Sequence, residues 1–474
     1  MKSRWFVVLG TLIIQVSLGA VYIWSVFHTP LLTRFPSWKE TGATLPAQVI
    51  LGCFALAVIF AGRIQDRIGP RPVATAGGLM LGLGLILARF TASFPPSAAL
   101  VWLIITYSVL GGLGIGAAYV CPIATCVKWF PDKRGLITGL AVAGFGAGAF
   151  FFAPLAKGLI SGGNYQLFGK NIFALPEVGL FSTFLVLGLI FLITITIGAM
   201  FLKNPEPGFK PEGWNPPVSS NAERSLKAEY SPSEMFRTWQ FWLLWAVFLT
   251  GCASGLMVIM KASPIWQSFA LSSLISGIDK SHLNQIASAG ALAVSILAIF
   301  NSLGRIVWGK ISDLAGRKAT LLTMFLLCGL TMLFFNTFKP YPLFLISISL
   351  VGLCFGGFLA VFPAVTADFF GTKHYGANYG WMFSAYGAGG LLGPYLAAGL
   401  MKTSAIVSIK EVTAGTESLK QSMVVGDYSR AFIVAGVLCL LAAVALIALR
   451  RPQARTEKNK KDKKPKKKTT RNLI

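Results

Sequence analysis

Residues Asn301–Lys318 read N-S-L-G-R-I-V-W-G-K-I-S-D-L-A-G-R-K, and this segment combines two features from which the architecture can be inferred. It places Arg305 within an otherwise apolar run, and it ends in a short loop of glycine, aspartate and basic residues. An arginine inside a membrane-spanning helix is costly unless it faces a cavity or a partner, so we interpret Arg305 as a functional residue. An earlier copy of the loop, G-R-I-Q-D-R-I-G-P-R, occupies Gly62–Arg71.

The composition indicates a helical membrane protein. Only 12% of the 474 residues are charged, against about 25% in soluble domains, and the mean hydropathy is +0.67. Long apolar runs recur between short polar breaks, and alternating strand patterns are absent, which favours spanning helices over a β-barrel. The seven cysteines all fall in apolar runs and are interpreted as packing residues.

The apolar runs predict an all-α membrane protein with twelve transmembrane helices. Each run reaches the roughly 20 residues that a helix needs to cross the hydrocarbon. The predicted spans are 5–27, 45–64, 72–91, 98–127, 135–157, 178–202, 239–265, 283–308, 319–337, 341–365, 376–401 and 428–450. They form two bundles of six helices, at 1–202 and 239–450, with a linker at 203–238 and a basic tail at 451–474.

The basic residues predict the orientation in the membrane. They gather in the tail and in alternate loops, so the positive-inside rule places both termini in the cytoplasm, and we expect the chain in the cell inner (plasma) membrane. The net charge of +25 follows this distribution and does not indicate nucleic-acid binding. The lysine-rich tail is expected to be solvated, with attraction to anionic lipid as the alternative. We expect the chain to act as a monomer.

The two halves repeat each other. Pro122 and Pro363 occupy equivalent places in the fourth and tenth spans. Glycines recur at matching offsets in the fifth and eleventh spans: Gly135, Gly139, Gly146 and Gly148 against Gly376, Gly380, Gly387 and Gly389. Two homologous bundles around a shared midplane site is a transporter design.

The paired loops have a predicted structural role. Gly62 and Gly309 allow a close approach of helices. Asp66 and Asp313 can cap a neighbouring helix N-terminus or pair with basic residues of the loops. Such contacts would hold one side of the protein shut in one state and release it in another, whereas the alternative is a simple turn with solvated charges. The predicted gating residues are Gly62, Asp66, Arg67, Gly309, Asp313 and Arg317.

Further segments carry a family resemblance. They are W-F-P-D-K-R-G-L at Trp129–Leu136, M-F-R-T-W-Q-F-W at Met235–Trp242, D-F-F-G-T at Asp368–Thr372, N-Y-G at Asn378–Gly380 and Y-I-W at Tyr22–Trp24. With the two loops, the chain resembles the major facilitator superfamily and, within it, the oxalate/formate antiporter family. The resemblance covers nearly the whole chain except 161–176, 403–427 and the tail.

The resemblance implies two six-helix domains around a cavity that opens alternately to each side, and a small carboxylate as substrate. The family's oxalate carrier uses an arginine in span eight and a lysine in span eleven. Arg305 matches the arginine, but Tyr386 stands at the position of the lysine. One fixed cation suits a monocarboxylate, whereas two suit a dicarboxylate. Tyr22 and Tyr119 match the family's aromatic cage. Less polar residues stand at three further cage positions: Phe355, Leu359 and Phe383.

The residues themselves support an anion site. Arg305 lies eight residues before Asp313, about 12 Å along a helix, which places it near the depth of a central cavity. Its guanidinium can bind a carboxylate through two hydrogen bonds, whereas the alternative is an arginine that snorkels to the membrane surface. Asn301, one turn earlier, is a further candidate contact. Three tyrosine hydroxyls are candidate donors, although each could instead only pack: Tyr22, Tyr119 and Tyr386.

We therefore predict a secondary transporter, not an enzyme, that moves a small monocarboxylate such as lactate, pyruvate or formate. The alternatives are oxalate/formate-type dicarboxylate exchange and a non-transporting sensor on the same fold. No carboxylate lies in the middle of a predicted span, so a buried relay of acidic residues is not indicated, while anion exchange and proton cotransport both stay open. The three histidines fall near span ends, and no metal or cofactor is expected.

Overall fold

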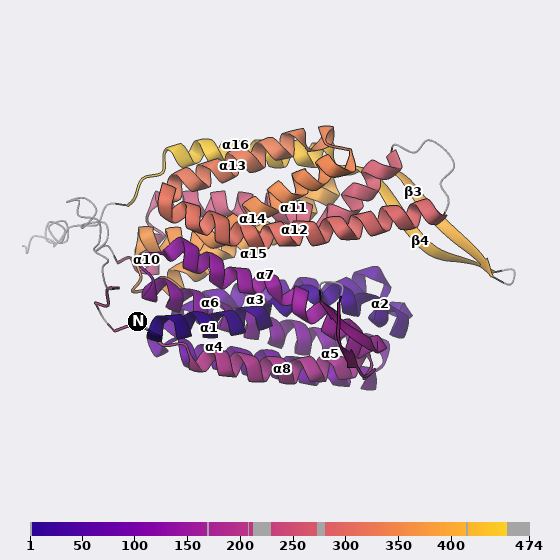
Figure 1. The fold of residues 1–474 in the computed structure, drawn as a ribbon, viewed down its shortest axis with the longest axis horizontal. Coiled ribbons are helices and arrows are strands. Elements are labelled where there is room, and N and C mark those ends of the chain that lie inside the picture. Colours follow the sequence, from indigo (N-terminus) through magenta and orange to yellow (C-terminus); the bar gives the residue numbers. More distant parts are fainter. Residues whose placement is uncertain are drawn as a thin grey trace, which may run out of the picture.

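The computed structural model describes residues 2–167, 170–206, 208–211, 229–272, 280–413 and 416–452, and they form two helical bundles that lie side by side (Figure 1). The twelve-helix fold predicted from the sequence is confirmed. Eleven helical stretches are long and apolar enough to cross a membrane, and the twelfth predicted span is the 26-residue helix α15. Half of the predicted linker and nearly all of the tail lie outside the described residues, at 207, 212–228 and 453–474.

The first bundle, called here the N half, runs from Lys2 to Met200. Its elements are α1 Lys2–Leu18, η1 Gly19–Ile23, α2 Trp24–Arg34, η2 Pro36–Trp38, α3 Lys39–Ile68, α4 Pro70–Ala88, η3 Arg89–Ser93, α5 Pro96–Leu103, η4 Ile104–Leu110, α6 Gly111–Trp129, α7 Arg134–Ser161, β1 Gly163–Leu167, β2 Lys170–Leu175 and α8 Leu180–Met200.

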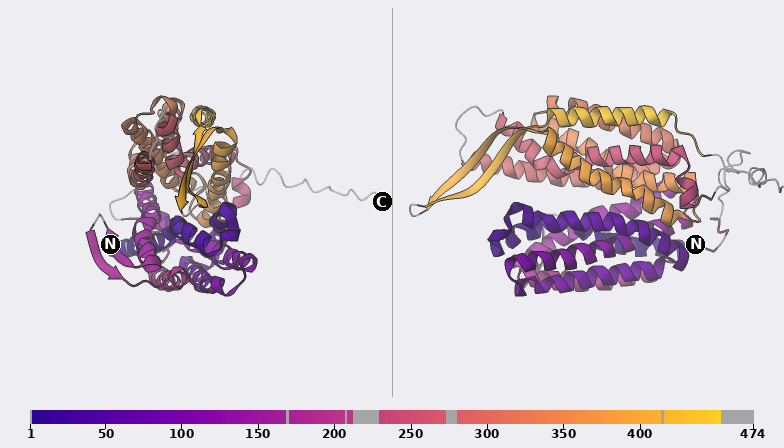
Figure 2. Two further views of the ribbon diagram at one scale, coloured as in Figure 1. Left: turned by 90° about the vertical axis from the view of Figure 1, so that its right-hand side faces the viewer. Right: turned by 180° about the vertical axis from the view of Figure 1, so that it is seen from behind.

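The second bundle, the C half, runs from Pro232 to Ile447. Its elements are α10 Pro232–Met235, α11 Trp239–Ser272, α12 Lys280–Ala315, α13 Arg317–Phe334, η5 Phe335–Thr337, α14 Tyr341–Phe370, α15 Tyr375–Leu400, β3 Lys402–Thr413, β4 Thr416–Asp427 and α16 Ser429–Ile447. The N-terminus and the end of α16 lie at the same end of the molecule, which we call the terminal end (Figure 2).

Two predicted spans are less regular than the sequence suggested. The first is broken into α1 and α2 by the 3₁₀ turn η1, and it continues to Arg34 rather than ending at 27. The fourth contains a π-helical segment, η4, between α5 and α6. Apolar runs fix the length of a span, but they do not report a change in hydrogen-bond pattern within it.

Four strands correct the expectation that strand patterns are absent. β1 pairs antiparallel with β2, and β3 pairs antiparallel with β4, so each predicted insertion forms a hairpin. The β3–β4 hairpin extends beyond the helices at the end opposite the terminal end (Figure 1). Backbone groups outside a helix still need partners, and pairing two strands of one connection supplies them locally.

Glycine residues lie at the helix contacts between the two halves. α3 packs against α15, and α7 packs against α12. A side chain at Gly62 would collide with the carbonyl oxygen of Gly376, and one at Gly309 would collide with that of Gly135. These positions therefore keep the backbones of opposite halves in contact, as small residues do between membrane helices.

Candidate functional site

Arg305 lies on α12 where the two halves meet. It is 1% exposed, and its Nη1 donates to the carbonyl oxygen of Val142 on α7, in the other half. Its Nε lies 3.3 Å from Oδ1 of Asn301, the neighbour predicted one turn earlier. Gly146 on α7 lies beside this region, because a Cβ there would come within 2.9 Å of Oγ of Ser302 and 3.4 Å of Cζ of Arg305. The arginine is thus buried against the N half and does not snorkel to a membrane surface.

Arg305 keeps capacity for an anion. A guanidinium has five N–H donors, and the contacts to Val142 and Asn301 engage Nε and Nη1. Within the described part of the chain, no ion pair joins Arg305 to a carboxylate. A buried cation without a counter-charge is expensive unless an anion joins it.

Tyr22 and Tyr386 bring a second contact across the two halves. Their hydroxyl oxygens lie 3.1 Å apart, with Tyr22 in η1 of the N half and Tyr386 on α15 of the C half. Tyr386 is 6% exposed, whereas Tyr22 keeps 39% of its surface exposed. Tyr22 is therefore the more open member of this pair.

Tyr119 lies in an aromatic cluster between the halves. Its ring centroid is 5.1 Å from that of Phe54, 5.4 Å from Phe145 and 5.1 Å from Phe383. Phe383 stacks on Tyr386 at 4.8 Å, so the cluster continues to the Tyr22 contact. The sequence reading missed Phe54 and Phe145, because a phenylalanine in an apolar run gives no signal that separates a cluster between halves from ordinary packing.

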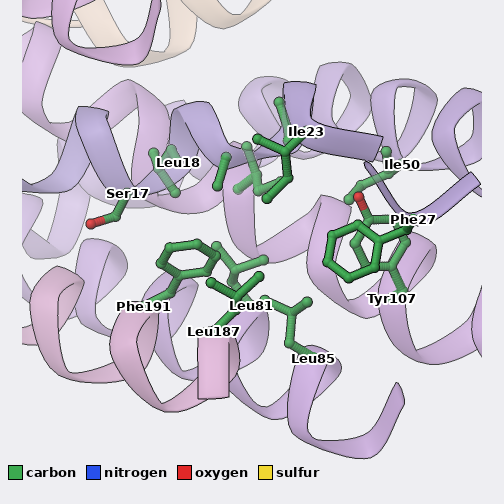
Figure 3. Close-up of a pocket in the computed structure, with 13 residues that line it drawn as sticks. Ser17, Leu18, Ile23, Phe27, Ile50, Leu81, Leu85, Tyr107, Leu187 and Phe191 are labelled. Carbon is green, nitrogen blue, oxygen red and sulfur yellow. The ribbon is translucent and has the colours of Figure 1, made fainter. Parts of the chain in front are cut away.

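A small cavity inside the N half is a different feature (Figure 3). It has a volume of about 20 Å³ and is lined mainly by aliphatic and aromatic side chains, among them Ile23, Leu81, Leu85 and Phe191. Ser17 and Tyr107 supply its polar atoms, and no cation lines it. An anion there would be left without a counter-charge, so this cavity is not a carboxylate site.

Asp313 joins the C half to the N half at the terminal end. Its two carboxylate oxygens accept the backbone N–H groups of Gly135 and Leu136, each at 2.8 Å, at the start of α7. Arg317 pairs with Asp313 at 2.7 Å and with Asp368 at 2.7 Å. Arg134 of the N half reaches Asp368 at 2.6 Å. This cluster, which we call the Asp313 gate after its predicted role, holds four charged side chains from both halves.

Asp66 makes the reciprocal contact, which we call the Asp66 gate. Its carboxylate accepts the N–H groups of Gly376 at 3.1 Å and Ala377 at 2.9 Å, at the start of α15. Gln65 also donates to it at 2.6 Å, and Lys128 lies 3.7 Å away. A carboxylate at a helix N-terminus satisfies free N–H groups and the helix dipole, so each aspartate caps a helix of the opposite half.

One predicted gating residue lies elsewhere. Arg67 is exposed, and no hydrogen bond or ion pair joins it to another residue that the structure describes. Three residues that the loop motif did not indicate take part instead: Lys128, Arg134 and Asp368. They lie in other loops or helix ends, so only the fold brings them to the gates.

The chain is similar to known transporters over most of its length. A family model described as Major Facilitator Superfamily matches residues 3–277 and 255–474. The MFS-type transporter YhjX of Escherichia coli is 32% identical over 393 residues, which cover 82% of this chain and 86% of that protein. The oxalate:formate antiporter of Oxalobacter formigenes is 27% identical and covers 84% of this chain and 85% of its own length. Apicoplast pyruvate carrier 1 of Toxoplasma gondii is 25% identical, with 85% of each chain covered.

A solved structure shows the same fold at low identity. The proton:xylose symporter XylE superposes with a TM-score of 0.62 and 13% identity, covering 94% of this chain and 95% of the other. The paired bundles, the two reciprocal loops and the match of the family model agree. This multi-pass membrane protein belongs to the major facilitator superfamily.

Proposed function

We propose that this protein carries small monocarboxylate anions across the membrane by alternating access. The observation that carries the proposal is Arg305, a buried cation at the meeting of the halves with donors to spare and, among the described residues, no acidic partner. A carboxylate fits a guanidinium with two parallel hydrogen bonds. The hydroxyls of Tyr22 and Tyr386, and the aromatic cluster around Tyr119, would complete the site.

Two relatives support a carboxylate as substrate. One is named an oxalate:formate antiporter and another a pyruvate carrier, and both align with most of this chain. The proposed site has one fixed cation, Arg305, which favours a substrate with one carboxyl group over a substrate with two. Oxalate at Arg305 would leave its second carboxylate without a fixed cation, and an unpaired buried charge costs several kcal/mol even after relaxation.

The two gates supply a mechanism for alternation. Asp66 and Asp313 would hold the terminal end shut by capping helices of the opposite half, while part of Tyr22 stays exposed. Release of both caps would let the domains 1–202 and 239–450 rock about the anion and expose Arg305 at the terminal end. We place that end, with both termini and the 203–238 linker, in the cytoplasm, and the chain in the plasma membrane as a monomer.

Competition in proteoliposomes tests the proposal. Uptake of labelled lactate, pyruvate or formate by the wild-type chain should be inhibited more strongly by these anions than by oxalate. Tyr386→Lys should shift the preference toward oxalate, because it adds the second cation. Absence of uptake of any of these anions by folded protein would contradict the carrier function, and tighter binding of oxalate than of the monocarboxylates by wild type would contradict the one-cation argument.

A further inference from the structure

Tyr379 carries a buried hydroxyl that belongs neither to the proposed anion site nor to the gates. It lies on α15 with 0% of its surface exposed, and its Oη has no hydrogen-bond partner among the residues that the structure describes. The hydroxyl of Tyr119, from the N half, lies near it, but no hydrogen bond of acceptable geometry joins the two. Few buried hydroxyls in folded proteins lack a partner, because their lost hydrogen bonds to water are then not replaced.

The hydroxyl lies at a depth between the proposed anion site and the Asp66 gate. Tyr379 precedes Tyr386 by seven residues on α15, so both lie on the same helix face, about 10 Å apart along the axis. The ring of Phe383 contacts both, with centroids 5.7 Å from Tyr379 and 4.8 Å from Tyr386. Only three residues separate Tyr379 from Gly376, whose N–H group Asp66 accepts at the terminal end.

The N half shows a satisfied hydroxyl at the equivalent place. Thr138 on α7 corresponds to Tyr379, because each stands directly before the second repeated glycine of its span. Its Oγ1 lies 2.8 Å from the carbonyl oxygen of Ala360 on α14, in the opposite half, and within reach of carbonyl oxygens of its own helix. Ala360 corresponds to Tyr119, since each stands three residues before the repeated proline. Thr138 therefore has acceptors at this place, whereas Tyr379 has none among the described residues.

The packing of Tyr379 does not depend on its hydroxyl. Its ring centroid lies 5.6 Å from that of Tyr375 and 5.7 Å from that of Phe383. Phenylalanine would keep both contacts and would avoid the unmet hydrogen bond. The hydroxyl thus adds no stabilising bond while the terminal end is closed, and a role for it would come from the state in which that end is open.

We infer that the Tyr379 hydroxyl contacts the transported anion during its release at the terminal end. The inference rests on the proposed carrier function and adds a residue to it. When the contacts of Asp66 separate, α15 and the N half move apart, and the hydroxyl faces the opened path. A carboxylate that leaves Arg305 loses its fixed cation, and a hydroxyl donor lowers the cost of this step because a desolvated anion needs hydrogen bonds. Tyr119 supplies a second hydroxyl beside that of Tyr379.

Tyr379→Phe separates this role from packing, because it removes only the hydroxyl. The variant should be at least as stable as wild type in thermal unfolding of the full chain in detergent, since an unmet hydrogen bond is removed. Exchange in proteoliposomes should nevertheless slow by about tenfold, the contribution of one hydrogen bond to a charged group. The probe is labelled lactate, pyruvate or formate, whichever the wild-type chain takes up fastest. Equilibrium affinity for that anion, which depends mainly on Arg305, should stay close to that of wild type.

The matched control is Tyr375→Phe, one turn closer to the terminal end. Tyr375 is also fully buried, but its Oη lies 3.3 Å from the carbonyl oxygen of Pro363. The same substitution therefore removes a hydrogen bond that the closed state makes. This variant should lose stability and keep the wild-type exchange rate, which is the opposite of the result expected for Tyr379→Phe.

The outcomes distinguish a failure of the inference from a failure of the proposed function. Unchanged exchange by Tyr379→Phe, or a fall in rate that only follows a fall in stability, would overturn the inference and leave the carrier function intact. A loss of affinity as large as the loss of rate would place the hydroxyl in the site around Arg305 and overturn its role in release. Absence of uptake by folded wild-type protein would contradict the carrier function, and the inference with it.

Discussion

The two halves of the molecule share one backbone arrangement but carry different charges. A side chain at Gly139 would collide with the carbonyl oxygen of Arg305, and one at Gly380 would approach that of Val58 to 2.7 Å. Arg305 and Val58 thus occupy equivalent places in α12 and α3, one buried and charged, the other buried and apolar. The duplicated scaffold positions both residues alike, and only the side chain makes one of them a candidate anion site.

The two gates also differ in charge, and the Asp313 gate of the C half has more charged side chains. Each aspartate caps a helix of the opposite half with two backbone N–H groups. The Asp313 gate adds the Arg317–Asp368 pair, whereas the corresponding positions of the N half are Pro70 and Val127. The backbone contact is therefore common to both gates, and among the described residues only the Asp313 gate adds an ion pair between the halves, that of Arg134 with Asp368.

The comparison of Arg305 with Val58 predicts the largest effect. Arg305→Ala should reduce uptake by roughly 100-fold or more, because removing one partner of a buried ionic contact costs about 3–5 kcal/mol. Val58→Ala should lower stability by about 2 kcal/mol through lost packing while leaving uptake per folded protein nearly normal. Both are measured as labelled-substrate uptake in proteoliposomes, normalised to protein that elutes as folded in size-exclusion chromatography. Near-normal uptake by Arg305→Ala would remove the arginine from the site.

The two gates should respond unequally to the same substitution. Asp313→Asn leaves Arg317 with one anionic partner fewer and should change the exchange rate by roughly tenfold, since hydrogen bonds to charged groups contribute about 1.5–3 kcal/mol. Asp66→Asn loses a longer pairing with Lys128 and should change the rate about threefold. Exchange kinetics are compared with substrate affinity, which neither variant should alter. Equal rate effects would deny the asymmetry, and a selective loss of affinity at unchanged rates would deny a gating role.

Tyr386→Phe should have the smallest effect. Tyr386 precedes Gly387 on α15, and its equivalent before Gly146 on α7 is Phe145, so the substitution makes the two halves alike at this place. The ring can still stack on Phe383, while the hydroxyl contact to Tyr22 is lost. We expect affinity to fall about threefold, as for one neutral hydrogen bond. Tyr22→Phe removes the same contact and is the matched variant; a loss above about 30-fold in only one of them would show that its hydroxyl binds the anion directly.

Much of the fold could be predicted because a lipid bilayer permits few kinds of backbone structure to cross it. Apolar runs of membrane length form helices, since each backbone polar group must find its partner within the span. The repeated glycines and loops identified the duplication, because helices whose backbones pack closely need small residues at the contact, and glycine is recognised directly in a sequence. The breaks at η1 and η4 and the two hairpins were not predicted, because they depend on local hydrogen bonding that hydropathy does not report.

The candidate site could likewise be predicted only in part. The sequence by itself identified Arg305 as the candidate functional residue and placed Asp66 and Asp313 in paired loops, because charge in an apolar run and a repeated motif are both local signals. Only the tertiary structure decided their partners: Val142 lies 163 residues from Arg305, and Gly376 lies 310 residues from Asp66. It also brought Arg134 to Asp368 across 234 residues, while Arg67 lies exposed. Contacts between halves follow from how two bundles pack, and no local pattern in either bundle encodes which residue of the other it will meet.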